Sequence, residues 1–202
     1  MDSDARETRT TNGEIMSELS TIKDLLEEEI QDLYSAEKQL TKAIPKMAKG
    51  SNNEELSAAF EAHLKETEGQ IDRLEQAADI LEIKVSGKKC KGMEGVIAEG
   101  AEALDEDGDE HVLDLGIIGA GSRVEHYEMA GYTTAINLAT QLGEDDVVEL
   151  LSQNLKEEEA ADEKLRTIGQ QILQEAPTEE NEESETEESE DTAPKKKAAG
   201  AH

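Results

Sequence analysis

The sequence predicts an all-α protein whose main domain is a four-helix bundle. Aromatic residues are scarce, with one Phe, three Tyr and no Trp in 202 residues, so Leu, Ile, Val, Met and Ala must build the core. This composition favours helix packing over a sheet, in which β-branched and aromatic residues are enriched. In four long segments the apolar residues recur alternately three and four positions apart, which is the spacing of a helical bundle seam.

The first long helix is predicted to begin within residues 17–21 and to end at Gly50. Thr21 and Asp24 have the spacing of a capping box, and glycine commonly follows the last turn of a helix. Leucine, isoleucine and methionine occupy the apolar line of this helix, except that Glu37 holds a central position. An acid at such a position is expected to point toward the core.

The second long helix is predicted over residues 51–81. It begins with Ser51-Asn52-Asn53-Glu54, in which the first and last residues match a capping box. Its apolar line is polar at the centre, where His63 is followed by Glu66 or Thr67. The interior of the bundle is therefore expected to be polar at the level of these residues.

A connection of about 25 residues follows, which is long for a tight hairpin. Residues 93–104 have the spacing of a short extra helix, and residues 105–109 read as an acidic turn. A connection of this length can cross from one end of a bundle to the other. A crossover between the second and third long helices is the connectivity of ferritin-like bundles, so this is the predicted fold.

Two more long helices are predicted, over residues 109–142 and from Glu144 onward. Glu125 lies on the buried line of the first of these, with Glu128 beside it. The second has two acids on its apolar line, four positions apart. All four long helices of the bundle therefore direct at least one acid inward.

The bundle is expected to occupy residues 17–175. Residues 1–16 and 176–202 are polar and without periodicity, and both are predicted to be disordered. The single cysteine, Cys90, excludes an intrachain disulfide and fits a reducing compartment. The sequence has no apolar run of about 18 residues that would predict a membrane span, and no signal-peptide pattern, so we expect a cytoplasmic protein.

The chain is strongly acidic, with a formal net charge of −30 from 50 acidic and 20 basic residues. Such a surface repels nucleic acid and anionic membranes, so neither is an expected partner. Two explanations of the acidity stay open. Adaptation to high intracellular salt, which screens the repulsion between like charges, is favoured over an ordinary acidic protein with a charged tail.

The acids on the four buried lines predict a metal site inside the bundle. A buried carboxylate is unfavourable unless it is paired or bound to a cation. Several of these side chains also lie three or four residues apart and so share a helix face. One such acid alone can be a solvated or lysine-paired group, but four helices with an acid each favour a shared site. The predicted ligands are Glu37, His63, Glu66, Glu125, Glu128, Glu158 and Asp162.

This ligand set is rich in oxygen, which suits iron, manganese, magnesium or calcium better than copper or structural zinc. His126 adjoins Glu125, but one residue turns a helix by about 100°, which directs His126 away from the site. Tyr34 and Tyr132 are expected to lie beside the ligands. Cys90 lies in a lysine-rich run, and such a setting can lower the pKa of a thiol.

Five motifs make the chain similar to the YciF-type ferritin-like family over residues 18–173. They are Tyr34-Ser35-Ala36-Glu37-Lys38-Gln39-Leu40, His63-Leu64-Lys65-Glu66-Thr67, Lys89-Cys90-Lys91-Gly92-Met93, Val124-Glu125-His126-Tyr127-Glu128 and Leu155-Lys156-Glu157-Glu158. The resemblance implies a ferritin-like bundle with a dinuclear metal site, a link to stress responses and a homodimer. Some relatives have Glu and His where this chain has Lys65 and Glu68, so a second imidazole in this helix is missing.

Together these observations predict a protein that binds two divalent metal ions, with iron as the first expectation and manganese as the second. Its expected activity is the oxidation of Fe(II) by peroxide or oxygen, and no catalytic residue is assigned. A non-catalytic, stress-related bundle that binds a cation weakly or not at all is the alternative. Iron storage in a cage is a weaker one, because nothing in the sequence identifies a cage-forming surface.

Overall fold

The computed structural model describes residues 10–11, 14–15 and 19–178. Most of the leader predicted over residues 1–16 and most of the tail predicted over residues 176–202 lie outside them. The described elements are β1 (Thr10–Thr11), β2 (Glu14–Ile15), α1 (Ile22–Gly50), α2 (Glu54–Leu81), α3 (Lys91–Leu104), α4 (Glu110–Leu142) and α5 (Asp145–Ile172). The two strands pair as a small antiparallel hairpin, and the predicted all-α domain is confirmed for the rest.

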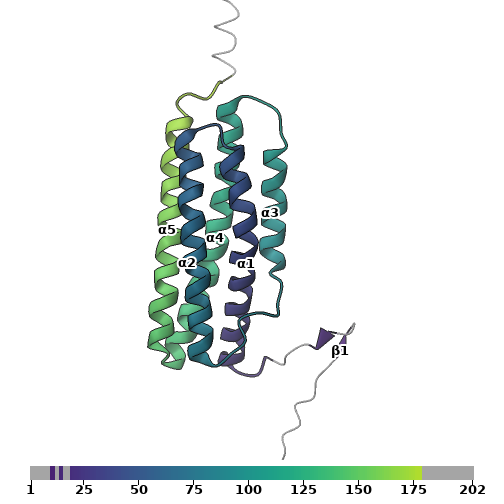
Figure 1. Ribbon diagram of the computed structural model, residues 1–202, viewed down its shortest axis with the longest axis vertical. Helices are drawn as coiled ribbons and strands as arrows, with labels where there is room; N and C mark the ends of the chain where they lie inside the picture. The colour runs from purple at the N-terminus through teal and green to yellow at the C-terminus, as the bar shows by residue number, and fades with distance from the viewer. Residues whose placement is uncertain (1–9, 12–13, 16–18, 179–202) are drawn as a thin grey trace, which may run out of the picture.

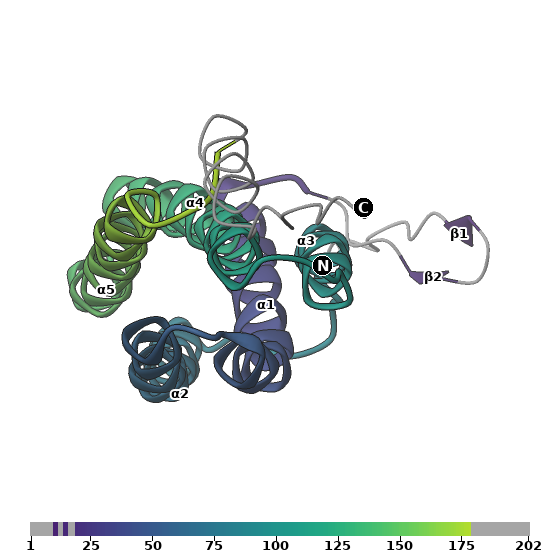
Figure 2. The same cartoon turned by 90° about the horizontal axis from the view of Figure 1, so that it is seen from above.

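Four helices form the bundle, and α3 lies outside it (Figure 1). Helix α1 packs against α2 and α4, and α5 packs against the same two helices, while α3 contacts α4 and α1 (Figure 2). Along the chain, α3 returns toward the end of the bundle where α2 began, so α2 and α4 run in the same direction. This is the predicted crossover. No helix in the described part of the chain is long and apolar enough to cross a membrane.

The first helix begins as predicted, whereas the second does not. Thr21 and Asp24 form a reciprocal capping box at the start of α1. The capping box expected between Ser51 and Glu54 is wrong, because Ser51 instead closes α1, with its hydroxyl donating to the Met47 carbonyl oxygen at 2.8 Å. The cap of α2 is Asn53, whose side-chain oxygen accepts from two backbone N–H groups of the first turn.

The connection to α3 is fixed by a small buried cluster around Cys90. The Cys90 Sγ atom lies 2.9 Å from Asp32 Oδ2 and 3.0 Å from the Tyr127 hydroxyl, and it accepts from the Met93 backbone N–H at 3.3 Å. Burial and the hydrogen bond to Asp32 raise the pKa of the Cys90 thiol. The lysine-rich run therefore does not lower this pKa, and Cys90 caps and anchors α3.

Two apolar clusters fill the bundle. The first includes Leu26, Ile30, Leu74, Val147 and Leu151, from the half in which α1 begins. The second includes Ile44, Leu56, Phe60, Ile117 and Ile168, from the half in which α1 ends. Because these clusters use opposite halves of the same helices, the middle of the bundle is left to other residues, and those residues are polar.

Candidate metal centre

A layer of buried polar side chains crosses the middle of the bundle. Each of the four bundle helices contributes to it, with α1 supplying one member, α4 two, and α2 and α5 three each. The members are Glu37, His63, Thr67, Gln70, Glu125, Glu128, Asn154, Glu158 and Asp162. Helix spacing explains the layer, because these residues continue the buried lines that carry apolar side chains above and below.

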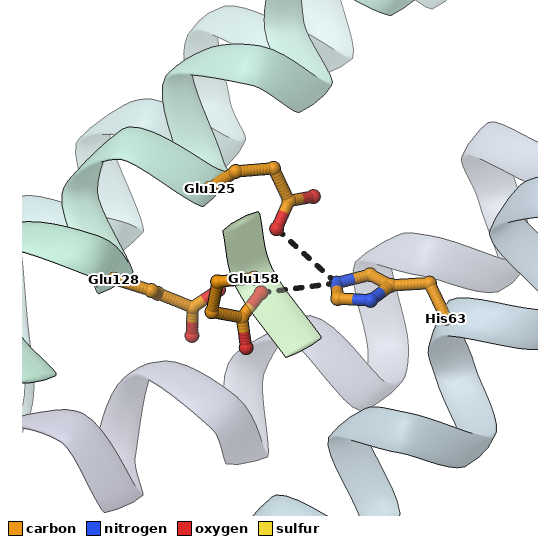
Figure 3. Close-up of side chains that lie close together, drawn as sticks. All are labelled: His63, Glu125, Glu128 and Glu158. Carbon is orange, nitrogen blue, oxygen red and sulfur yellow. Dashed lines mark ion pairs between the residues drawn. The ribbon is translucent and has the colours of Figure 1, made fainter. Parts of the chain in front are cut away.

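Four of these side chains converge on one point. His63, Glu125, Glu128 and Glu158 each offer a ligand atom, and these atoms all lie within 4.8 Å of one another. The imidazole faces the carboxylates (Figure 3), with His63 Nε2 at 3.4 Å from Glu125 Oε2 and 3.7 Å from Glu158 Oε2. The structure thus brings together four of the seven predicted ligands, from α2, α4 and α5.

Several carboxylate oxygens of this group, and one of the neighbouring Glu37, lack a hydrogen-bond donor among the described residues. Neither oxygen of Glu128 has a hydrogen-bond partner among the described residues, and the same holds for one oxygen each of Glu37, Glu125 and Glu158. His63 Nε2 is also without a hydrogen bond there. A buried carboxylate without a partner is strongly unfavourable, so the site is built for a group that satisfies several oxygens at once.

The pKa values of these acids show how unfavourable their charges are without a cation. Burial, together with the charge of Glu158, raises the pKa of Glu37 to about 8. Burial, with the charge of Glu37 added, raises the pKa of Glu125 to about 7. The pKa values of Glu128 and Glu158 lie well above the usual carboxyl range, again mainly because of burial. A divalent cation would reverse this effect by favouring the ionised carboxylates.

His63 is oriented by Glu66. Burial by itself lowers the pKa of His63, but the hydrogen bond to Glu66 and the charges of Glu158 and Glu37 outweigh it, so the pKa is raised. The His63 Nδ1 atom lies 3.4 Å from Glu66 Oε2. A carboxylate on the second ring nitrogen is the usual arrangement for a histidine that binds metal through the first.

Glu66 itself does not join the converging group. Its side chain is 47% exposed, and Thr67 takes the buried position next to it. The pattern left Glu66 and Thr67 as alternatives, and the structure buries Thr67, whose hydroxyl donates to the His63 carbonyl oxygen at 3.0 Å. This location suits Glu66 as the partner of His63.

Glu37 and Asp162 are buried in the same layer but do not belong to the converging group. Glu37 is fully buried on α1, and it accepts a hydrogen bond from the Tyr132 hydroxyl. Asp162 Oδ2 is 3.1 Å from Arg166 Nε and 3.5 Å from His126 Nε2, while its Oδ1 atom has no hydrogen-bond partner in the described chain. One oxygen of each acid is therefore held by the protein, and the other remains free to accept.

The sequence also predicted that His126 lies outside the site and that Tyr34 and Tyr132 lie beside its ligands. His126 is 66% exposed and lies outside the converging group, as helix geometry predicted, and its Nε2 atom contacts Asp162. Tyr132 lies beside Glu37, as expected, but Tyr34 does not lie beside a ligand. Its hydroxyl donates to Glu75 at 3.0 Å near the surface, so that expectation is wrong.

The structure adds three polar residues that the sequence did not assign to the site. Gln70 donates a hydrogen bond to Glu158. Asn154 donates to the Tyr132 hydroxyl at 2.9 Å and accepts from Arg73, which also pairs with Glu157. The chain from Arg73 through Asn154 and Tyr132 to Glu37 links the surface to the layer. The only signal in the sequence was that Gln70 lies at the polar centre of its helix line.

The residues present fit a divalent metal ion. They supply several carboxylates and one imidazole, all from helices, which is the donor chemistry of iron and manganese sites in bundles. The unpartnered oxygens noted above are the atoms that a cation would bind. The arrangement departs from the usual ligand set of such bundles, because only one histidine is among the converging side chains.

Comparison with known proteins agrees with the fold. The family described as a domain of unknown function, DUF892, matches residues 21–177. Protein YciF of Escherichia coli strain K12 is 45% identical over 151 residues, which are 74% of this chain and 91% of that protein.

Two solved structures are also similar. The crystal structure of the E. coli stress protein YciF has a TM-score of 0.76 at 42% identity, and the match covers 78% of this chain and all of that one. YcfI of Rhodopseudomonas palustris has a TM-score of 0.72 at 45% identity, covering 74% of this chain and 96% of that one. These values confirm the predicted resemblance.

Proposed function

The chain belongs to the DUF892 family and is of the YciF type, and we propose that it binds two divalent metal ions in the core of its bundle. Iron is the expected metal, with manganese as the alternative. Four converging side chains, His63, Glu125, Glu128 and Glu158, are the proposed central ligands. Glu37 and Asp162 are proposed to complete the site, and Glu66 to orient the imidazole.

The observation that carries this proposal is the set of buried carboxylate oxygens without hydrogen-bond partners. They belong to residues that are at most 4% exposed, and they come from three helices. Apart from the long contacts of His63 Nε2 with Glu125 and Glu158, no basic side chain among the described residues pairs with these oxygens. A cation is the group that would satisfy several of them together, and its binding would also stabilise the fold.

Charge balance favours two ions over one. Glu37, Glu125, Glu128 and Glu158 are four buried carboxylates, and burial raises the pKa of each. One divalent ion would balance two of them, whereas two ions would balance all four. The full set of predicted ligands is also larger than one ion needs.

The proposed reaction is the oxidation of Fe(II) by peroxide or oxygen. Two Fe(II) ions would together supply two electrons, which, with two protons, reduce one hydrogen peroxide to water. Two side chains orient the proposed ligands through hydrogen bonds: Gln70 orients Glu158, and Tyr132 orients Glu37. When the ions bind, the carboxyl groups release their protons to solvent. The apolar clusters shield the layer from water toward the two ends of the bundle.

The E. coli relative and the acidic composition of the chain support a proposal for its biological role. The E. coli relative is described as a stress protein, and we propose a stress-related role for this chain as well. We further propose that it acts in the cytoplasm as a homodimer, and that its net charge of −30 is an adaptation to high salt.

Anaerobic titration with Fe(II), followed by addition of oxygen or peroxide, tests the proposal. The expected result is saturation at two Fe(II) per chain, and then rapid oxidation seen in the near-ultraviolet absorbance. Glu158→Gln should lose both, and Glu159→Gln, at the exposed neighbour, should behave as wild type. Absence of Fe(II) binding by the wild type would contradict the metal site. Binding without accelerated oxidation would leave a non-catalytic metal protein.

A further inference from the structure

A pocket lies between α2 and α5 and reaches the metal-binding layer. It has a volume of about 290 Å³. Small side chains from both helices make up much of its lining, and they are Ala58, Ala59, Ala62, Ala160 and Ala161. Because a methyl group is the largest side chain at these five positions, the two helices leave open space beside the layer. We call it the alanine pocket.

Two candidate ligands form the floor of the alanine pocket. His63 and Glu125 line it, and each is at most 5% exposed. His63 Nε2 and Glu125 Oε2 have no hydrogen-bond partner among the described residues. The pocket therefore ends at unpartnered polar atoms of the proposed site.

The rim of the pocket carries charge. Glu66 lines it and is 47% exposed, and its Oε2 atom is 3.4 Å from His63 Nδ1. On the opposite wall, Lys164 of α5 pairs with Glu55 of α2. Because this pair joins two exposed side chains, it can open easily. An approaching cation would thus meet Glu66 before it reaches the buried carboxylates.

In the described part of the chain, neither the face formed by α1 and α4 nor the face formed by α1 and α2 has a comparable opening to the layer. Helix α3 packs against α4 and α1 and covers that face. A hollow of about 520 Å³ lies between α1 and α2, and none of the residues that line it is a candidate ligand. The alanine pocket, in contrast, includes three of them.

We propose that the alanine pocket is the route by which divalent cations reach the buried site, with Glu66 as the first carboxylate they meet. This inference rests on the proposed metal-binding function. The small side chains keep the route wide enough for a partly hydrated ion. His63 and Glu125 then replace its remaining water, because their free atoms face the end of the route.

Stopped-flow loading of metal-free protein with Co(II), followed by its visible absorbance, tests the route. The Ala62→Leu/Ala161→Leu double variant should load at least about tenfold more slowly. A blocked route slows loading and release equally, so the amount bound at equilibrium and the Kd should remain those of wild type. Ala98→Leu, on the exposed face of α3, is the matched control and should load normally. Circular dichroism and Tm verify that each variant is folded.

Two results would overturn the route. Loading of the double variant at the wild-type rate, whatever its Kd, would overturn the route while leaving the metal site intact. Failure of the wild type to bind Co(II) at all would overturn the site and the route together.

A second variant tests the role of Glu66. Glu66→Gln removes the charge at the rim, so loading at low salt should slow by about threefold, and high salt should abolish the difference. An unchanged loading rate at low salt would remove Glu66 from the route.

Discussion

Two buried carboxylates of α4, Asp114 and Glu128, have opposite surroundings. Asp114 is 2% exposed, and its two oxygens accept from the backbone N–H groups of Asn52 and Asn53 at 2.8 and 2.7 Å. The Asn52 side chain donates to it as well, at 3.3 Å. Glu128 is fully buried, and neither of its oxygens has a hydrogen-bond partner in the described chain.

The difference separates a structural acid from a binding one. Asp114 holds the loop between α1 and α2 against the start of α4, and its hydrogen bonds are complete. Glu128 lies in the middle of the same helix, where the protein provides no donor for its oxygens. Burial alone therefore does not identify a ligand, whereas burial without a partner points to a ligand that the chain itself does not supply.

The largest expected effect concerns metal affinity. Glu128→Gln should weaken metal binding by more than about 100-fold. Loss of a residue that only hydrogen-bonds a metal ligand already lowers metal affinity by about 10–100-fold. Metal-free Glu128→Gln should fold at least as stably as wild type, since the substitution removes an unpaired buried acid. Competition with a coloured chelator measures the affinity, and urea unfolding measures the stability. A stable variant with wild-type affinity would place Glu128 outside the site.

The pH dependence of the free energy of unfolding tests the buried carboxyl groups of the whole layer together. A carboxyl group with a raised pKa stabilises the fold fully below its unfolded pKa, near 4.5, and this contribution is lost as the pH rises through the folded value. The folded values are about 7 for Glu125 and about 8 for Glu37. Metal-free protein should therefore lose about 2 kcal/mol or more of stability between pH 5 and pH 8.

Saturation with metal should remove this loss, because the bound cation keeps the carboxylates ionised. Urea unfolding at fixed high salt, with and without metal, measures both curves. Equal slopes for the two forms would contradict the assignment of these acids to the site.

Asp114→Ala should have the reverse pattern of Glu128→Gln. It leaves the N–H groups of Asn52 and Asn53 without their acceptor, so we expect a loss of about 2 kcal/mol of stability. The metal content should not change. Urea unfolding with elemental analysis of the same sample checks both statements, and a loss of metal without a loss of stability would erase the distinction.

A smaller effect is expected at Gln70, which donates to Glu158. Gln70→Leu should weaken metal binding by about tenfold, because it frees Glu158 to rotate. The stability of the metal-free variant should fall by only about 1 kcal/mol, because Glu158 loses one hydrogen bond while the unpartnered Oε1 atom of Gln70 is also removed. Gln76→Leu, on the exposed face of α2, is the matched control. Equal affinities of the two variants would show that Gln70 does not position Glu158.

Each exposed acidic residue is expected to have the smallest effect on the stability of the fold. Their mutual repulsion destabilises the fold at low salt, and screening relieves it. The Tm should therefore rise steadily as salt is increased to molar concentration. A Tm that does not change with salt would remove the proposed adaptation to high salt.

Local spacing was enough to predict most of the fold. The helices, the crossover and the Thr21–Asp24 capping box follow from residues close together in the sequence. The start of α2 does not, because three consecutive residues, from Ser51 to Asn53, can each cap a helix. Asp114 binds two of the backbone N–H groups there, and its distance in sequence hides that contact.

The candidate site was predictable to the level of a helix face. From His63, three residues turn a helix by about 300° and four by about 400°, so Glu66 and Thr67 lie on either side of the same line. Only the packing of the neighbouring helices decides that Thr67 is buried. Gln70 and Asn154 escaped assignment because neutral side chains give no charge signal.

Elemental analysis of wild-type protein, purified in high salt without chelators, is the decisive test of the metal site. We expect two atoms of iron or manganese per chain, retained through gel filtration. Asp114→Ala should retain them and Glu128→Gln should not. Wild-type protein that retains no metal, and takes none up when Fe(II) or Mn(II) is added, would contradict the metal site.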